Sequence, residues 1–192
     1  MTAPPERVWR VFPWDPDAPD TERFSPTYVP PTQGTGRFDL SGLGGGVLYL
    51  AETPEHAVAE MIQHYRGQVL DGADLRIAGH PLALVEVTLP ARVRHGVIDL
   101  CDPEILVRLG ARPDETASNH RKVTQRIAAQ VHRVGHAGLR WWSALTGDWH
   151  TVVLFLDRLD PGPAYGAPEP LTIDHPAVAE AARVLGIRRA AH

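Results

Sequence analysis

Four side chains of different chemistry stand in order along the middle of the chain. Arg37 lies just before a glycine-rich stretch, and Tyr49 lies in the apolar run that follows it. Glu60 comes 11 residues after Tyr49, and Ser143 precedes a late apolar run. Arginine is a permanently charged donor that suits anions, and a carboxylate can stabilise positive charge that develops during a reaction. These residue types could bind an anion and stabilise positive charge if the fold brings them together.

Each of these residues also has an ordinary structural interpretation. Arg37 can cap a turn, and Tyr49 in an apolar strand can be a core residue. Glu60 stands four residues before His64, which is the spacing of a solvated pair on a helix. Ser143 follows two tryptophans, a context in which a serine often satisfies a neighbouring group inside a packed core.

Other motifs of chemical interest are incomplete. The glycine run 42–46 has no Gly-Lys-Ser/Thr after it and opens a strand, so it predicts a surface turn and not a phosphate loop. His132 and His136 are four residues apart, but no HExxH is present and Gly135 indicates that the helix is ending. Cys101 is expected to be a small buried residue. No serine stands in Gly-x-Ser-x-Gly, and we expect neither a metal nor a bound cofactor.

A helix over 54–66 is expected to position Glu60. Thr53 is a good N-cap, Pro54 suits the first helical position and Glu55 complements the helix dipole. The apolar residues of this helix recur at helical spacing and should face the core. They are Val58, Met61, Ile62 and Tyr65. Glu60 then lies on the opposite side, beside His64, and looks away from the core.

The remaining pattern predicts an α+β fold. Strands are expected at 8–12, 47–51, 81–89 and 151–156, and helices at 103–109, 118–134 and 176–185, the last ended by Gly186. No regular alternation of strand and helix supports a doubly wound sheet. The core side of helix 118–134 should carry Val123, Ile127, Gln130, Val131 and Val134. Eight prolines within residues 1–33 predict an irregular wrapping segment there.

Composition excludes several classes of protein. The chain has 192 residues, 43% of them hydrophobic, and a net charge of −4. These values fit a soluble globular protein with one core, and disfavour a general nucleic-acid binder. No apolar run is long enough to span a membrane, and a single cysteine fits a reducing compartment, so we expect the cytoplasm. We divide the chain into a Pro-rich segment 1–33, a catalytic domain 34–160 and a linker with a C-terminal helix 161–192.

Seven short stretches, in order, resemble the RES family, which is named for an arginine, a glutamate and a serine. They are Val8-Trp9-Arg10-Val11-Phe12, Gly36-Arg37-Phe38, Val47-Leu48-Tyr49-Leu50-Ala51, Ala57-Val58-Ala59-Glu60, Leu109-Gly110, Thr124-Gln125 and Gly138-Leu139-Arg140-Trp141-Trp142-Ser143-Ala144. The resemblance runs from about residue 7 to residue 158. Two departures are visible: Phe38-Asp39 stands where the family often has Trp-Asn, and an aromatic pair precedes Ser143.

The resemblance implies a single-domain fold like that of the ADP-ribosyltransferase toxins, with a split β core, flanking helices and a cleft for NAD. It further implies a toxin of a bacterial toxin–antitoxin pair that depletes NAD by cleaving the nicotinamide–ribose bond. Such cleavage passes through an oxocarbenium-like state that a carboxylate stabilises, a role that falls to Glu60. Arg37 and Arg10 would bind the pyrophosphate. Tyr49 would stack on nicotinamide or its ribose, and Ser143 would donate a hydrogen bond to a ribose or phosphate oxygen.

The acceptor and the partner stay open at this point. Water, inorganic phosphate or a protein side chain can accept the ADP-ribosyl group, and Arg10, Arg37 and Arg140 offer sites for a free phosphate. Arginine-modifying transferases generally carry Glu or Gln two positions before the catalytic glutamate, where this chain has Val58, so protein modification ranks last. The resemblance implies a small Xre-like helical antitoxin. The termini expose surfaces for it or for a homo-oligomer, and a catalytically silent binding module is the rival interpretation.

Overall fold

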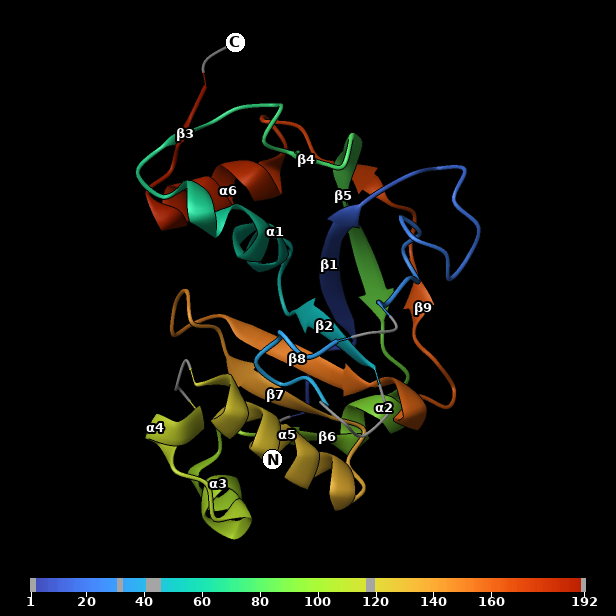
Figure 1. Ribbon diagram of the computed structural model, residues 1–192, viewed down its shortest axis with the longest axis vertical. Helices are drawn as coiled ribbons and strands as arrows, with labels where there is room; N and C mark the ends of the chain where they lie inside the picture. The colour runs from blue at the N-terminus through green and yellow to red at the C-terminus, as the bar shows by residue number, and fades with distance from the viewer. Residues whose placement is uncertain (1–2, 31–32, 41–45, 117–119, 191–192) are drawn as a thin grey trace. The chain divides into compact units, whose positions relative to one another are not determined.

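The computed structural model describes residues 3–30, 33–40, 46–116 and 120–190 (Figure 1). The chain forms two compact units. The first contains residues 1–6, 29–50 and 89–163, and the second contains residues 7–28, 51–88 and 164–192. The glycine run 42–46 lies largely outside the described residues, so its predicted turn is not described here.

The first unit is built on strands β2 (Val47–Ala51), β8 (His150–Phe155), β7 (Gly138–Trp142) and β6 (Val97–Asp99), in that order across the sheet. β7 and β8 form an antiparallel pair, while β6 runs parallel to β7. Gly138 is required in this pair because a Cβ there would overlap the backbone oxygen of Val153. The backbone N–H of Leu156 donates to Gly46 O at 3.0 Å, which places the start of β2 beside the end of β8.

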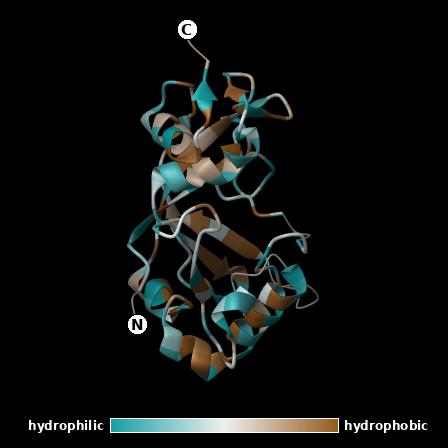
Figure 2. Cartoon of the chain, turned by 90° about the vertical axis from the view of Figure 1, so that its left-hand side faces the viewer, coloured by the Kyte–Doolittle hydropathy of each residue, from teal (hydrophilic) through white to brown (hydrophobic). Residues whose placement is uncertain are grey.

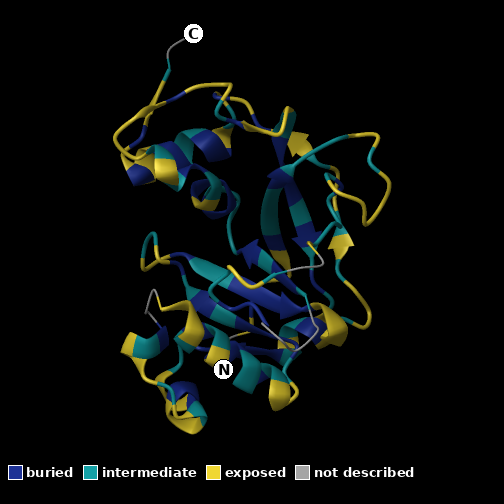
Figure 3. Cartoon of the chain, in the orientation of Figure 1, coloured by how far each residue is buried: buried dark blue, intermediate teal, exposed yellow. Residues whose placement is uncertain are grey.

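Helices on this sheet supply the other half of its core. They are α2 (Ala91–Gly96), α3 (Pro103–Leu109), α4 (Pro113–Thr116) and α5 (Arg121–Arg133), with the short 3-10 helix η2 (Leu156–Arg158) after β8. Buried side chains from α3, α5, β7 and β8 form one cluster with Phe38 and Leu40. The strands are largely hydrophobic whereas the helices also carry hydrophilic residues, and the outer turns of α3 and α5 are exposed (Figures 2 and 3).

The second unit is built on β5 (His80–Thr88), which pairs antiparallel with β1 (Arg7–Pro13) over seven residues. Three two-residue strands also pair with β5: β4 (Arg76–Ile77), β9 (Ala164–Tyr165) and β10 (Glu169–Pro170). Two helices pack here, α1 (Pro54–Ile62), continued by the 3-10 helix η1 (Gln63–Tyr65), and α6 (Pro176–Leu185). β3 (Val69–Leu70) and β11 (Arg188–Arg189) form a separate parallel pair.

Helix α1 is covered on two sides, because it packs against both β1 and α6. Its predicted start is confirmed: Thr53 Oγ1 accepts a hydrogen bond from His56 N at 3.3 Å, and Pro54 opens the helix. Val58 and Ile62 are buried as expected, and so are Ala57, Ala59 and His56. The small side chains of Ala57 and Ala59 leave room for α1 to pack against both elements.

Most long elements lie where the pattern placed them, and the α+β class is confirmed. The helices 103–109 and 176–185 have the expected bounds, and Gly186 ends α6 with φ 68°. Other expectations were wrong. Val134 is 61% exposed because α5 ends at Arg133, and Cys101 is only partly buried. The α-helix expected over 54–66 ends at Ile62 and continues as the 3-10 helix η1, and Met61 and Tyr65 are only partly buried. Strand β7 over 138–142 was not predicted. Among the described residues, no helix is long and apolar enough to cross a membrane.

Candidate functional site

The loop that carries Arg37 is organised around the buried carboxylate of Asp39. Asp39 Oδ2 accepts hydrogen bonds from Gly34 N and Gly36 N, both at 2.7 Å. Asp39 Oδ1 accepts a third hydrogen bond from the Tyr49 hydroxyl at 2.8 Å. Gly36 is the residue that fits here, because a Cβ at this position would overlap Asp39 Oδ1 and the Tyr49 hydroxyl oxygen.

Tyr49 links this loop to strand β2. Its hydroxyl accepts a hydrogen bond from Phe38 N at 2.9 Å while it donates to Asp39. Its ring packs against the core of the first unit. Burial and then Asp39 raise the pKa of Tyr49 far above its ordinary value, although the Phe38 N–H and the nearby Arg37 oppose this. Tyr49 is therefore a neutral phenol whose hydroxyl orders the loop, and Arg37 and Tyr49 belong to one local cluster.

Helix α5 holds the same loop from the other side. Gln125 Nε2 donates to Gly34 O at 3.0 Å and to Gly36 O at 2.9 Å. The Thr124 hydroxyl donates to Arg37 O. Asp39 thus binds N–H groups of the loop, whereas Thr124 and Gln125 bind its carbonyl oxygens.

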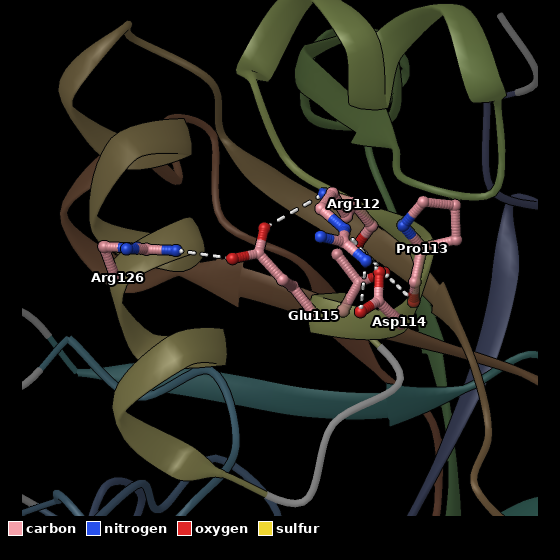
Figure 4. A network of polar contacts seen from close by, with 6 residues as sticks. Arg112, Pro113, Asp114, Glu115 and Arg126 are labelled. Carbon is pink, nitrogen blue, oxygen red and sulfur yellow. Dashed lines mark hydrogen bonds and ion pairs between the residues drawn. The ribbon is translucent and has the colours of Figure 1, made fainter.

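The Arg37 side chain reaches the end of helix α4. Its Nη2 donates to Thr116 O at 2.8 Å, and its guanidinium carbon lies 5.6 Å from the centre of the Phe38 ring. Helix α4 is in turn tied to α5, since Glu115 Oε1 accepts a hydrogen bond from Arg126 Nη2 at 3.1 Å (Figure 4). Glu115 Oε2 also accepts from the backbone N–H of Arg112 at 3.1 Å, which closes the first turn of α4.

Ser143 follows strand β7 in the same unit. Its backbone N–H donates to Trp149 O at 2.7 Å, and its hydroxyl oxygen accepts a hydrogen bond from Leu145 N at 3.1 Å. The side chain is buried, so Ser143 shapes the turn between β7 and β8. The hydrogen bond to Leu145 N matches the structural interpretation of Ser143, in which its hydroxyl group satisfies a neighbouring polar group.

Glu60 lies in the second unit, on the outward side of α1. Its carboxylate is 43% exposed, and Oε1 lies 3.1 Å from Nε2 of His56, whose side chain is fully buried. Gln63 Nε2 also donates to Glu60 Oε2 at 3.1 Å. The outward direction of Glu60 was predicted correctly, but its helical partner is His56, four residues earlier, and not His64.

Arg10 also belongs to the second unit, where it holds the Pro-rich segment. Its Nη1 and Nη2 donate to Pro26 O at 2.8 Å and to Tyr28 O at 2.6 Å. Burial lowers the pKa of this guanidinium, while nearby Tyr165 raises it. A role for Arg10 in phosphate binding stays a prediction.

The structure thus brings Arg37 and Tyr49 into one cluster, and it describes Ser143 in the same unit at the end of β7. Glu60 and Arg10 are described in the other unit. Three further residues, Asp39, Gln125 and His56, were given no role in the sequence analysis. Signals for them existed: Thr124-Gln125 is one of the stretches that resemble the RES family, Asp39 follows the Gly36-Arg37-Phe38 stretch, and His56 stands at i, i+4 spacing to Glu60. No group of His, Cys, Asp or Glu within the described ranges could hold a metal ion.

Sequence comparison assigns the family. The sequence model of the RES domain matches residues 7–174, a span that includes all five predicted site residues. The chain belongs to the RES-domain family. This single RES domain takes in residues from both compact units. No curated protein is similar enough in sequence to match the chain.

A solved structure supports the fold of this RES domain. The crystal structure of the M. tuberculosis MbcT-MbcA toxin-antitoxin complex contains a similar chain, the toxin MbcT. The two chains are 18% identical with a TM-score of 0.58, and the match covers 94% of this chain and 89% of that chain. Identity at this level shows the fold alone. The predicted ADP-ribosyltransferase-like α+β fold is confirmed.

Proposed function

We propose that this RES domain is a toxin that depletes NAD by cleaving the bond between nicotinamide and ribose. The observation that carries the proposal is Glu60: an outward carboxylate on a helix, held at 3.1 Å by a buried histidine, within a chain of the RES family. Glycosidic cleavage needs such a carboxylate close to the sugar.

In the proposed reaction, the bond between the ribose carbon and the pyridinium nitrogen breaks, and its electron pair leaves with neutral nicotinamide. Positive charge develops on the ribose ring, and the Glu60 carboxylate stabilises it. An oxygen of phosphate or water then forms the new bond at the same carbon. Phosphate gives ADP-ribose 1″-phosphate, while water gives ADP-ribose and releases a proton.

The other assigned residues bind and orient NAD. Arg37 supplies planar N–H donors for the pyrophosphate, and Arg10 is assigned to the same group. The Tyr49 hydroxyl is engaged by Asp39 and Phe38, so its proposed contribution is stacking through the ring and not proton transfer. Ser143 would contribute a hydrogen bond to ribose or phosphate.

Transfer to a protein side chain fits this chain less well. Val58 stands two residues before Glu60, where arginine-modifying transferases generally carry Glu or Gln, and it is fully buried in α1. It therefore offers no polar group for recognising an acceptor side chain. We place this alternative behind phosphate and water.

A toxin that destroys NAD needs an inhibitor, and we propose a small Xre-like helical antitoxin as the partner of this chain. The support is the family and the likeness to MbcT, which was solved in a toxin-antitoxin complex. We place its action in the cytoplasm, where NAD is available. Gel filtration of the purified protein tests whether the chain also forms a homo-oligomer.

The proposal is tested by incubating the purified protein with NAD, with and without inorganic phosphate, and identifying the products by mass spectrometry. We expect nicotinamide together with ADP-ribose 1″-phosphate or ADP-ribose. Loss of NAD that is indifferent to phosphate and yields only ADP-ribose would assign water as the acceptor. Intact NAD with folded protein would overturn the proposal in favour of a silent binding module.

A further inference from the structure

The loop 34–39 is held by its own Asp39 side chain and by side chains from β2 and α5 of the first unit. Asp39 accepts from two of its N–H groups, and the Tyr49 hydroxyl accepts from a third, Phe38 N. Gln125 donates to two of its carbonyl oxygens. The backbone on both sides of Arg37 is therefore held by hydrogen bonds to side-chain groups.

Helix α5 contacts the backbone around Arg37 directly and supports its guanidinium group through helix α4. Through Gln125 and Thr124 it binds the backbone around Arg37, and through Arg126 and Glu115 it holds helix α4. The last residue of α4, Thr116, accepts the hydrogen bond from the Arg37 guanidinium. The backbone and the charged group of Arg37 are thus both linked to α5, although 79 residues separate Arg37 from Thr116 in the sequence.

We propose that Gln125 and Asp39 are positioning residues, which hold the Arg37 loop in the conformation that binds the NAD pyrophosphate. This inference rests on the proposed function and adds two residues to it. An arginine on a loose loop would lose conformational entropy when it binds an anion, whereas a loop ordered in advance has already lost it. Neither residue needs to touch NAD, so each acts through Arg37.

Methionine substitutions on α5 give a matched test of Gln125. Gln125→Met keeps side-chain length and helix propensity, adds no charge and removes the donor to Gly34 O and Gly36 O. Gln130→Met is the control, because Gln130 lies on the same helix but donates to Leu109 O at 2.9 Å, away from the loop. Calorimetry in a Glu60→Gln background, which slows NAD cleavage during the titration, should show NAD affinity falling by about tenfold or more in Gln125→Met. The affinity of Gln130→Met should be unchanged, although its melting temperature falls by a similar amount.

Two substitutions test Asp39. Asp39→Asn preserves the shape, and its Oδ1 can accept from the glycine N–H groups while its Nδ2 donates to the Tyr49 hydroxyl oxygen. Asp39→Ala removes all three hydrogen bonds. We expect Asp39→Asn to keep most of the NAD affinity and Asp39→Ala to lose at least as much as Gln125→Met. In turnover assays the losses should be mainly in KM, since Glu60 is unchanged.

Hydrogen exchange of residues 33–40 separates this inference from the proposed function. We expect faster exchange there in Gln125→Met and Asp39→Ala and unchanged exchange in Gln130→Met. Unchanged exchange in all three variants, or faster exchange with undiminished NAD affinity, would overturn the positioning role. If the unsubstituted protein binds no NAD, the proposed function fails and so does a positioning role toward NAD, while exchange still shows whether the two residues order the loop.

Discussion

Buried polar side chains contact two of the groups assigned to NAD, Glu60 and the loop that carries Arg37. Asp39 lies inside the Arg37 loop, and His56 lies beneath Glu60, 3.1 Å from its carboxylate. Burying such groups costs free energy unless their hydrogen bonds are made. Each of them therefore indicates a place where hydrogen bonds fix the local geometry. The partly buried Arg37 side chain and the exposed Glu60 carboxylate are then left with few conformations.

At the same scale, the Cys101 thiol is predicted to be unreactive. Burial, followed by the charge of Asp99, raises the pKa of Cys101 to about 12. The thiolate is the reacting form, so at pH 8 alkylation by iodoacetamide should be on the order of a hundredfold slower or more than for a free cysteine. The rate should still be rising at pH 10, and unfolding in guanidinium should restore ordinary reactivity. A rate that levels off near pH 9 in the folded protein would contradict this.

Among single residues, the assignments from sequence rest on a family pattern or a local spacing. Those of Arg37, Tyr49, Glu60 and Ser143 were made in this way and stay predictions. Asp39 and Gln125 were not assigned roles, because the partners of Gln125 lie 89 and 91 residues away and no local rule connects them.

At the scale of elements, predictions succeeded where caps and periodicity agreed. Helix α1 has its start fixed by Thr53 and Pro54, and α6 its end fixed by Gly186. The two-residue strands β3, β4, β9, β10 and β11 were missed, because they are defined by their partners and not by their own pattern. His56 was missed since one apolar stripe predicts one buried side, whereas α1 packs against both β1 and α6.

The N-cap of α1 is open to a direct test. Thr53→Ala removes the acceptor for His56 N and should lower the free energy of unfolding by about 1 kcal/mol. Thr53→Ser keeps a hydroxyl and should retain most of the stability. Urea denaturation of the three proteins measures this. Equal losses in the two variants would show that the cap hydrogen bond is not the source of the effect.

At the scale of the whole molecule, one RES domain draws its five assigned residues from two compact units. Arg37, Tyr49 and Ser143 belong to the first unit, and Arg10 and Glu60 to the second. Composition indicated a globular protein and the resemblance indicated the fold, but neither could show this division. It depends on long-range contacts, as when β1 near the N-terminus pairs with β5 over residues 80–88.

The central claim, that Glu60 of this RES domain cleaves NAD, is tested most directly by nicotinamide release from Glu60→Gln and Glu55→Gln. Both substitutions neutralise a glutamate on α1, but Glu55 lies in its first turn. We predict that Glu60→Gln lowers the rate by roughly a hundredfold or more, while Glu55→Gln stays within about twofold, as expected for a helix-dipole group. A folded Glu60→Gln protein that releases nicotinamide as fast as the unsubstituted protein would contradict the claim.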